Sequence, residues 1–165
     1  MNLNIPEYDE DIIIFDSNKI TNYPDGISID LSYYTCFHNL TYIDLNETGV
    51  TGDIIHFKSL PNLTHIDLNR TDVMGDIIHF KSLLNLTHIY LSRTGVTGDI
   101  AHLKSLPRLT KIDFNVTDVT GDIAHLTSVP NLVTIHLMIT NVTGDEESFR
   151  NYRWVRGEPY CAIFL

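Results

Sequence analysis

The stretch "LTHIDLNRTDVMGDIIHFKSLLN", residues 63–85, recurs along the chain with a fixed spacing of 23 residues and without gaps. Four copies are complete, and the fifth ends early as "LVTIHLMITNVTGD" (132–145). The leucines that open the copies are Leu40, Leu63, Leu86, Leu109 and Leu132. Such a repeat is typical of a solenoid, in which coils that cannot bury an apolar face alone stack on one another.

Each repeat begins with alternating apolar and polar residues. In the first copy, Ile43 and Leu45 are expected to point to one side and Tyr42 and Asp44 to the other. This period of two predicts a half-buried strand. Residues that tolerate left-handed or turn backbone follow the Thr of each copy, and we place the turn there. These residues are Gly49, Asp72, Gly95, Asp118 and Asn141.

The second half of each repeat, for example "TGDIIHFKSL" (51–60), is too short and too rich in turn residues for a long helix. Its apolar residues recur every third position, which brings them back under the strand. We therefore expect 3₁₀ or irregular turns in this arm, with a short second strand near Thr-Gly-Asp-Ile.

The repeat also resembles a known family. "LTYIDLNETGV" (40–50) is similar to the leucine-rich-repeat signature L-x-x-L-x-L-x-x-N-x-L, with Thr48 at the Asn position, and "TGDI" (51–54) resembles the plant-type segment L-T-G-x-I-P. The resemblance implies an α/β-type repeat solenoid, mostly β, in which a right-handed coil has a parallel concave sheet and a 3₁₀ or irregular convex arm. Thr replaces the signature Asn in all five copies, and Ile or Ala replaces the plant-type Pro.

We expect one domain over residues 1–165, with five repeats at 40–145 between an N-terminal cap (1–39) and a C-terminal cap (146–165). A degenerate strand is predicted at "ISIDLS" (27–32), and a strand or turn at "DIIIFDS" (11–17) should cover the first coil. "YCAIFL" (160–165) is predicted to supply a last strand or plug. The apolar patch of Val116, Met138 and Ile139 has two interpretations: it binds a partner, or the tail folds over it. We favour the second, because Trp154 and Phe164 need burial. Phe149 and Tyr152 continue the apolar register.

Composition narrows the class of partner. The 165 residues are 43% hydrophobic, which suits a globular core, and the formal net charge is −10. This charge disfavours nucleic acid and anionic membrane surfaces, which both attract clustered Lys and Arg. No apolar run approaches the ~20 residues that span a bilayer, and the first residues lack a signal-peptide pattern. We expect a monomer.

An Asp and a His, three positions apart, recur in the second half of four repeats. The pairs are Asp53 and His56, Asp76 and His79, Asp99 and His102, and Asp122 and His125. One interpretation is a metal ladder or an acid–base site. The other is architecture, in which each Asp accepts backbone N–H groups after the Gly turn. We favour architecture, because metal sites converge unlike ligands on one point and no nucleophile accompanies the pairs. No metal, cofactor or catalytic residue is expected.

The outward strand positions form the better candidate for a site, because they vary while the core positions do not. Tyr, His and Arg on a rigid surface are residue types that anchor protein interfaces. The resemblance implies recognition of a protein partner on this concave face, and an ordinary solvated face is the alternative. The predicted binding residues are Tyr42, Asp44, His65, Asp67, Arg70, His88, Tyr90, Arg93, Lys111, Asp113 and His136.

Two signals bear on the compartment. Seven Asn residues open N-x-Thr sequons, which would carry glycans in a secreted recognition module. They are Asn39, Asn46, Asn62, Asn69, Asn85, Asn115 and Asn141. The only cysteines, Cys36 and Cys161, lie about five strand spacings or ~24 Å apart in a solenoid, too far for a disulfide. Free thiols suit a reducing compartment, so we expect the cytoplasm, with a secreted or cell-surface module as the alternative.

Overall fold

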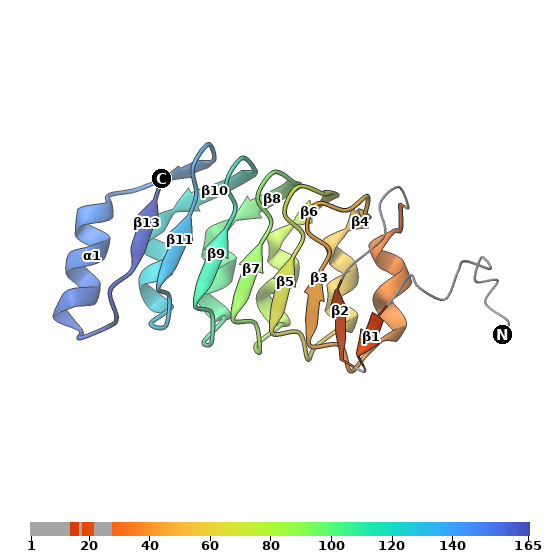
Figure 1. Cartoon of the computed structure of the whole chain (residues 1–165). Helices are drawn as coiled ribbons and strands as arrows, with labels where there is room; N and C mark the ends of the chain where they lie inside the picture. Colours follow the sequence, from red (N-terminus) through yellow and green to blue (C-terminus); the bar gives the residue numbers. More distant parts are fainter. Residues whose placement is uncertain (1–13, 17, 22–27) are drawn as a thin grey trace, which may run out of the picture.

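Two sheets and a row of 3₁₀ helices run side by side along the structure, a computed structural model that describes residues 14–16, 18–21 and 28–165 (Figure 1). Eight strands form the larger sheet: β1 (Ile14–Asp16), β2 (Lys19–Thr21), β3 (Tyr42–Asp44), β5 (His65–Asp67), β7 (His88–Tyr90), β9 (Lys111–Asp113), β11 (Thr134–His136) and β13 (Ala162–Phe164). Five form the smaller: β4 (Thr51–Asp53), β6 (Asp72–Asp76), β8 (Gly95–Asp99), β10 (Asp118–Asp122) and β12 (Asn141–Thr143).

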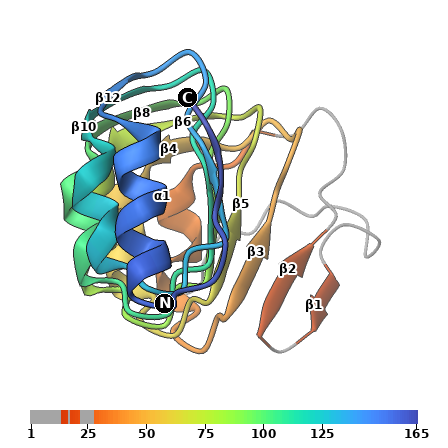
Figure 2. The ribbon, with the colours of Figure 1, turned by 90° about the vertical axis from the view of Figure 1, so that its left-hand side faces the viewer.

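The helices lie behind the larger sheet. The 3₁₀ helices are η1 (Leu31–Cys36), η2 (Ile54–Ser59), η3 (Ile77–Ser82), η4 (Ile100–Ser105) and η5 (Ile123–Ser128). One α-helix, α1 (Glu146–Val155), stands at the C-terminal end of this row, as the view along the solenoid shows (Figure 2). The short second strands and 3₁₀ turns that the sequence predicted are therefore confirmed.

The spacing of 23 residues sets the register of the larger sheet. Ile43 pairs with Ile66, which pairs with Ile89, and each has no more than 1% of its side chain exposed. The Phe57 and Phe80 rings stack behind them, 6.4 Å apart. Identical apolar residues in adjacent coils thus build one continuous core that no single coil could form.

The Asp column caps the 3₁₀ helices. Oδ1 of Asp53, Asp76, Asp99 and Asp122 accepts the backbone N–H two residues ahead, at 2.8 Å in every copy. Each of these bonds satisfies a donor that the first turn of a helix leaves without an intrahelical partner. The architectural interpretation of the Asp column is confirmed in this respect.

Replacing Asp76 by alanine should lower the free energy of unfolding by about 1 kcal/mol, because the Ile78 N–H loses its acceptor. Urea unfolding followed by circular dichroism measures the change. Asp76→Asn keeps an acceptor at the same place and should lose clearly less. Equal losses in the two variants would contradict a capping role.

The N-terminal coil begins earlier than the sequence suggested. Ile20, Leu31 and Tyr34 are buried and lie 23 residues before Ile43, Ile54 and Phe57, so the repeat already holds at β2 and η1. The predicted strand at 27–32 is wrong over its described part. Asp30 makes a single bridge to Thr51, and the Asp30 side chain then caps η1 by accepting the Ser32 N–H. Ile29 and Leu31 pack against the core at the start of η1.

The strand predicted within 11–17 is confirmed for Ile14–Asp16, which pairs antiparallel with β2; residues 11–13 and 17 lie outside the described residues.

The Thr residues that replace the signature Asn bond within their own coil. Each Oγ1 donates to the carbonyl three residues earlier, for instance Thr71 to Leu68 at 2.7 Å. The side-chain bonds between coils come from other positions. Thr64 donates to the Thr41 carbonyl at 2.9 Å, and Asn85 Nδ2 donates to the Pro61 carbonyl at 3.2 Å. The coils are therefore joined at the strand entrance, which the signature alone does not indicate.

The C-terminal segment extends the stack, and it does not fold over the sheet face. β13 pairs parallel with β11, so the predicted last strand is confirmed. The predicted covering of the apolar patch is wrong, since Trp154 is 83% exposed and Ile139 75% exposed. Phe149 is buried as expected, but Tyr152 is exposed and Arg153 takes the buried position. Helical geometry changes which residues face the core once α1 begins.

No helix within the described residues is long and apolar enough to cross a membrane.

Candidate functional site

The side chains of the larger sheet that point away from the core form the candidate site, here called the outer sheet face. The predicted columns lie in register across the strands. Tyr42 pairs with His65, and His65 with His88, while Asp67 pairs with both Asp44 and Tyr90. Lys111, Asp113 and His136 continue the same two columns on β9 and β11. The structure thus brings together nine of the eleven predicted residues as outward neighbours, and all nine are half-buried.

Four rings on this face contact one another and are here called the aromatic cluster: Tyr42, His65, His88 and Tyr90. The Tyr42 and His65 rings stack, with centroids 4.3 Å apart and planes 10° apart. The His65 and His88 centroids are 5.1 Å apart, and Tyr90 packs 5.5 Å from His65. Ring contacts of this kind stabilise the side chains in one arrangement.

Burial keeps the two histidines neutral. It is the largest cause that lowers the pKa of His65, to about 4, and the nearby His88 and Lys111 lower it further. Burial and then Lys111 also lower the pKa of His88. At neutral pH both imidazole rings are therefore uncharged hydrogen-bonding groups.

Lowering the pH from about 7.5 to about 5 should cost the wild type about 1 kcal/mol more stability than it costs His65→Gln. His65 binds a proton with a pKa near 6.5 when unfolded, but only near 4 when folded. The contribution of neutral His65 to the free energy of unfolding is thus fully present above pH 6.5 and is lost as the pH falls through 4. This stability difference is small because solvent screens the charge on a half-exposed ring. Urea midpoints at both pH values measure it, and an unchanged pH dependence in His65→Gln would contradict the assignment.

The carboxylates of Asp44 and Asp67 are each held by a hydrogen bond from the backbone two residues ahead. Oδ1 of Asp44 accepts the Asn46 N–H at 3.3 Å, and Oδ1 of Asp67 accepts the Asn69 N–H at 3.1 Å. Burial raises the pKa of Asp67, the Asn69 bond counteracts it, and the neighbouring carboxylates of Asp44 and Asp113 raise it again.

Further along the column, Asp113 Oδ2 lies 3.8 Å from His136 Nδ1.

Arg70 and Arg93 do not occupy strand positions, which corrects the prediction. They lie three residues beyond β5 and β7, with φ angles of 56° and 58°. Arg70 pairs with Glu47, and Arg93 lines a pocket of about 500 Å³ together with Met74 and Val116. Both arginines therefore stand at one edge of the outer sheet face.

The predicted position of the left-handed turn is also wrong, because the positive φ angles lie two residues earlier in each repeat. The non-glycine residues with positive φ in the described part of the chain are Glu47, Arg70, Arg93, Val116 and Ile139, whereas Gly49 and Gly95 do not have positive φ. A non-glycine residue in this region costs about 1 kcal/mol or more. The strain is offset because its N–H donates to the next coil, as Arg70 N does to the Ser92 carbonyl at 2.8 Å.

The His column does not converge. His56, His79 and His102 are partly exposed and His125 is exposed, each on its own 3₁₀ helix. Within residues 14–16, 18–21 and 28–165, no three His, Cys, Asp or Glu side chains are grouped as they would be to hold a metal ion.

Both cysteines are free, as predicted. Cys36 is exposed, whereas Cys161 is buried. Burial raises the pKa of Cys161 to about 11, against the lowering effect of Arg153 and Arg150.

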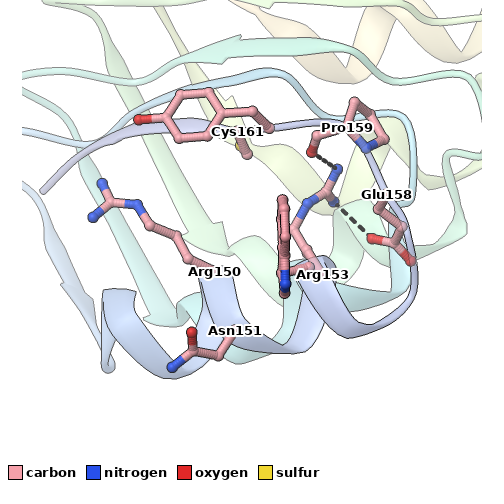
Figure 3. A pocket seen from close by; sticks show the side chains of 8 residues that line it. Arg150, Asn151, Arg153, Glu158, Pro159 and Cys161 are labelled. Carbon is pink, nitrogen blue, oxygen red and sulfur yellow. Dashed lines mark hydrogen bonds and ion pairs between the residues drawn. The ribbon is translucent and has the colours of Figure 1, made fainter.

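A pocket that sequence reasoning missed lies at the C-terminal end, between α1 and the chain that leads into β13 (Figure 3). Its volume is about 280 Å³. The lining residues are Arg150, Asn151, Arg153, Trp154, Glu158, Pro159, Tyr160 and Cys161. This segment lies beyond the repeat, so no periodicity could have indicated the pocket. The one sequence feature that could have indicated this pocket is Arg153, a charged residue in the segment that closes the end of the core.

Known structures share this architecture, although no protein-family model and no curated protein matches the chain. Internalin C2 from Listeria monocytogenes matches with a TM-score of 0.62 and 24% identity over 81% of this chain and 54% of that chain. The leucine-rich-repeat ectodomain of the receptor kinase SOBIR1 from Arabidopsis thaliana matches with a TM-score of 0.65 and 20% identity, over 76% of this chain and 73% of that one. The plant peptide hormone receptor RGFR1, in complex with RGF2, matches with a TM-score of 0.69 and 22% identity, over 80% and 22%.

These matches establish the fold that the signature predicted: the chain is a leucine-rich-repeat solenoid. It spans about half the length of the matched internalin and about a fifth of RGFR1.

Proposed function

We propose that this chain is a non-enzymatic recognition module that binds a protein or peptide partner on its outer sheet face. The observation that carries the proposal is the aromatic cluster on the eight-stranded sheet, where Tyr42, His65, His88 and Tyr90 hold one another in place. Rings fixed before binding lose little conformational entropy when a partner docks, which favours affinity.

The aromatic cluster lies on the side of the sheet away from the core. The core residues of the same strands, such as Ile66 and Ile89, point to the opposite side, where they are fully buried. Tyr side chains such as those of Tyr42 and Tyr90 are enriched at the centres of protein interfaces. RGFR1, which shares the fold, has a structure with the peptide RGF2 bound. By analogy of fold, this chain also binds a peptide or a loop of a protein.

The proposed compartment is the cytoplasm. The free thiols Cys36 and Cys161 support it. Several sequon asparagines also have structural roles: Asn62 Nδ2 donates to the His38 carbonyl at 3.0 Å, and Asn69 Oδ1 accepts the Ser92 N–H at 2.7 Å. These contacts support a structural origin of the repeated N-x-Thr pattern. Intact-mass measurement of the protein from its native source tests this, and attached hexose would contradict it.

A panel of selected binders tests the function. A peptide-display library panned against the immobilised full chain should yield binders that weaken about tenfold or more on Tyr90→Ala, because truncating an interface anchor typically removes 1–2 kcal/mol or more. Tyr152→Ala on α1 is the matched control, since Tyr152 is exposed and lies outside the outer sheet face. Unfolding curves confirm that both variants are folded. Binders that lose affinity on Tyr152→Ala and keep it on Tyr90→Ala would contradict the proposal.

A further inference from the structure

Two adjacent carboxylates on the outer sheet face form no ion pair with any residue that the structure describes. Asp44 and Asp67 are directly paired across β3 and β5, so their side chains project from neighbouring strands roughly 4.8 Å apart. In the part of the chain that the structure describes, neither residue forms an ion pair with Lys, Arg or His. The two negative charges therefore repel each other without compensation.

Each carboxylate retains an oxygen for a partner. Oδ1 of Asp44 and Oδ1 of Asp67 accept the backbone N–H groups of Asn46 and Asn69, which orients both groups. No hydrogen bond is formed by their Oδ2 atoms within residues 14–16, 18–21 and 28–165. A guanidinium group has five N–H donors, so two fixed carboxylates one strand apart can each accept an N–H from the same group.

Aromatic rings lie on either side of the acceptors. Tyr90 is paired with Asp67 on the next strand, and Tyr42 lies two residues before Asp44 on the same face. The Tyr42 ring already carries a cation, because Lys19 Nζ lies 5.7 Å from its centroid. The protein's own lysine thus shows that a positive group is accommodated on this platform.

The neighbouring charges confine the site. Lys19 precedes and Lys111 follows the Tyr42, His65 and His88 rings in register across the sheet. Arg70 at the edge is already paired with Glu47. Asp113, on the far side of Tyr90, has Lys111 two residues before it and His136 at 3.8 Å. The uncompensated negative charge is therefore concentrated at Asp44 and Asp67.

We propose that Asp44 and Asp67 together bind the guanidinium group of one arginine of the partner, with the Tyr90 ring beside it. The inference rests on the proposed function and names the chemistry that this face recognises. Arginine fits better than lysine, because its planar guanidinium presents several N–H donors in fixed directions and stacks on an aromatic ring, whereas an ammonium is a point charge. The formal net charge of −10 also draws cationic segments toward the chain.

The ionisation of the site is consistent with this occupant. The pKa of Asp67 is raised by burial and, after the opposing effect of the Asn69 bond, by Asp44 and Asp113. A bound guanidinium would lower that pKa, so arginine binding should weaken when the solution is acidified enough to protonate Asp67.

The test uses small probes and the full-length chain. N-acetyl-arginine methylamide is titrated into isotope-labelled protein, and the carboxyl and ring signals of Asp44, Asp67 and Tyr90 are followed by NMR. Saturable shifts at these residues are expected. The uncharged isostere N-acetyl-citrulline methylamide should bind about tenfold more weakly or not at all, as should arginine to Asp67→Asn. The lysine analogue should bind more weakly than arginine.

The matched control is Asp118→Asn on β10, an exposed carboxylate in the smaller sheet, which should leave the titration unchanged. Equal binding of citrulline and arginine, or unchanged binding to Asp67→Asn, would overturn the inference. Lysine binding as tightly as arginine would overturn the guanidinium assignment.

The two proposals fail separately. If the arginine probe does not bind while selected peptides still depend on Tyr90, the recognition face stands and its arginine subsite is wrong. If the probe binds at Asp44 and Asp67 but no selected binder depends on Tyr90, the proposed function fails and only a cation site remains. If neither result is obtained, both proposals are wrong.

Discussion

Gly98→Ala is expected to lower the free energy of unfolding by about 3 kcal/mol or more, close to the largest effect of a single substitution. Gly98 has a φ of +108°, where an L side chain is strained. The added Cβ would also lie 2.1 Å from Oδ1 of Asp76, the carboxylate that caps η3 in the preceding coil. One methyl group therefore strains its own turn and displaces the cap of its neighbour.

Two other glycines separate these contributions. Gly157 also has a positive φ, +68°, but an added Cβ would meet nothing within 4 Å, so Gly157→Ala reports backbone strain alone. Gly95 is not left-handed, and its nearest neighbour would be the Val73 carbonyl oxygen at 3.3 Å. Urea unfolding should rank Gly98→Ala well below both variants in stability. A loss for Gly98→Ala no larger than that for Gly157→Ala would show that the cap contact does not contribute.

Arg153→Met should destabilise the protein by about 3–5 kcal/mol, the range for breaking a buried charge pair on one side. The side chain is almost completely buried at the end of the solenoid. Its guanidinium donates to the carbonyls of Val129 at 2.9 Å and Leu132 at 2.7 Å, and it lies 3.3 Å from the carboxylate of the buried Glu158 (Figure 3). Met fills similar volume but leaves these oxygens and the Glu158 charge unpaired.

Arg156→Met is the matched control, because Arg156 binds the same Glu158 from an exposed position. Its loss should be much smaller than that of Arg153→Met in thermal unfolding. Adding Glu158→Gln to Arg153→Met should recover part of the stability by removing the stranded charge. A double variant no more stable than Arg153→Met would contradict this electrostatic explanation.

The repeating part of the fold could be predicted because its causes are local. The alternation of Ile43 and Leu45 with polar neighbours fixes a strand, and an Asp after Gly fixes a cap. The left-handed turn was placed wrongly because Glu47 is not a residue type that favours it. Its conformation depends on a hydrogen bond to the Asn69 carbonyl in the next coil, at 2.9 Å. Sequence patterns do not show such coil-to-coil bonds.

The two ends were harder to predict for the same reason. The first coil keeps the register at Ile20 and Tyr34 but lacks the leucines that define the repeat. At the other end, Trp154 was expected to be buried, yet α1 turns Arg153 inward and leaves Trp154 in solvent. Burying an Arg is favourable only where several carbonyls converge, which depends on the three-dimensional end of the stack.

The alternation of apolar and polar residues predicted which side chains lie on the outer sheet face. It did not predict which of those side chains contact one another. Side-chain conformations decide that Tyr42 stacks on His65 and that Asp113 approaches His136. They also decide that Asp44 and Asp67 remain without a cation in the described part of the chain.

Carboxyl footprinting of the chain bound to a selected peptide tests recognition on the outer sheet face most directly. A water-soluble carbodiimide and an amine modify accessible Asp and Glu side chains, and mass spectrometry reads the modification of each residue with and without the peptide. We predict that the peptide protects Asp44 and Asp113, on the outer sheet face, and leaves Asp72 and Asp118, on the smaller sheet, as reactive as before. Protection of Asp72 and Asp118 with Asp44 and Asp113 unchanged would place the partner elsewhere and contradict the account.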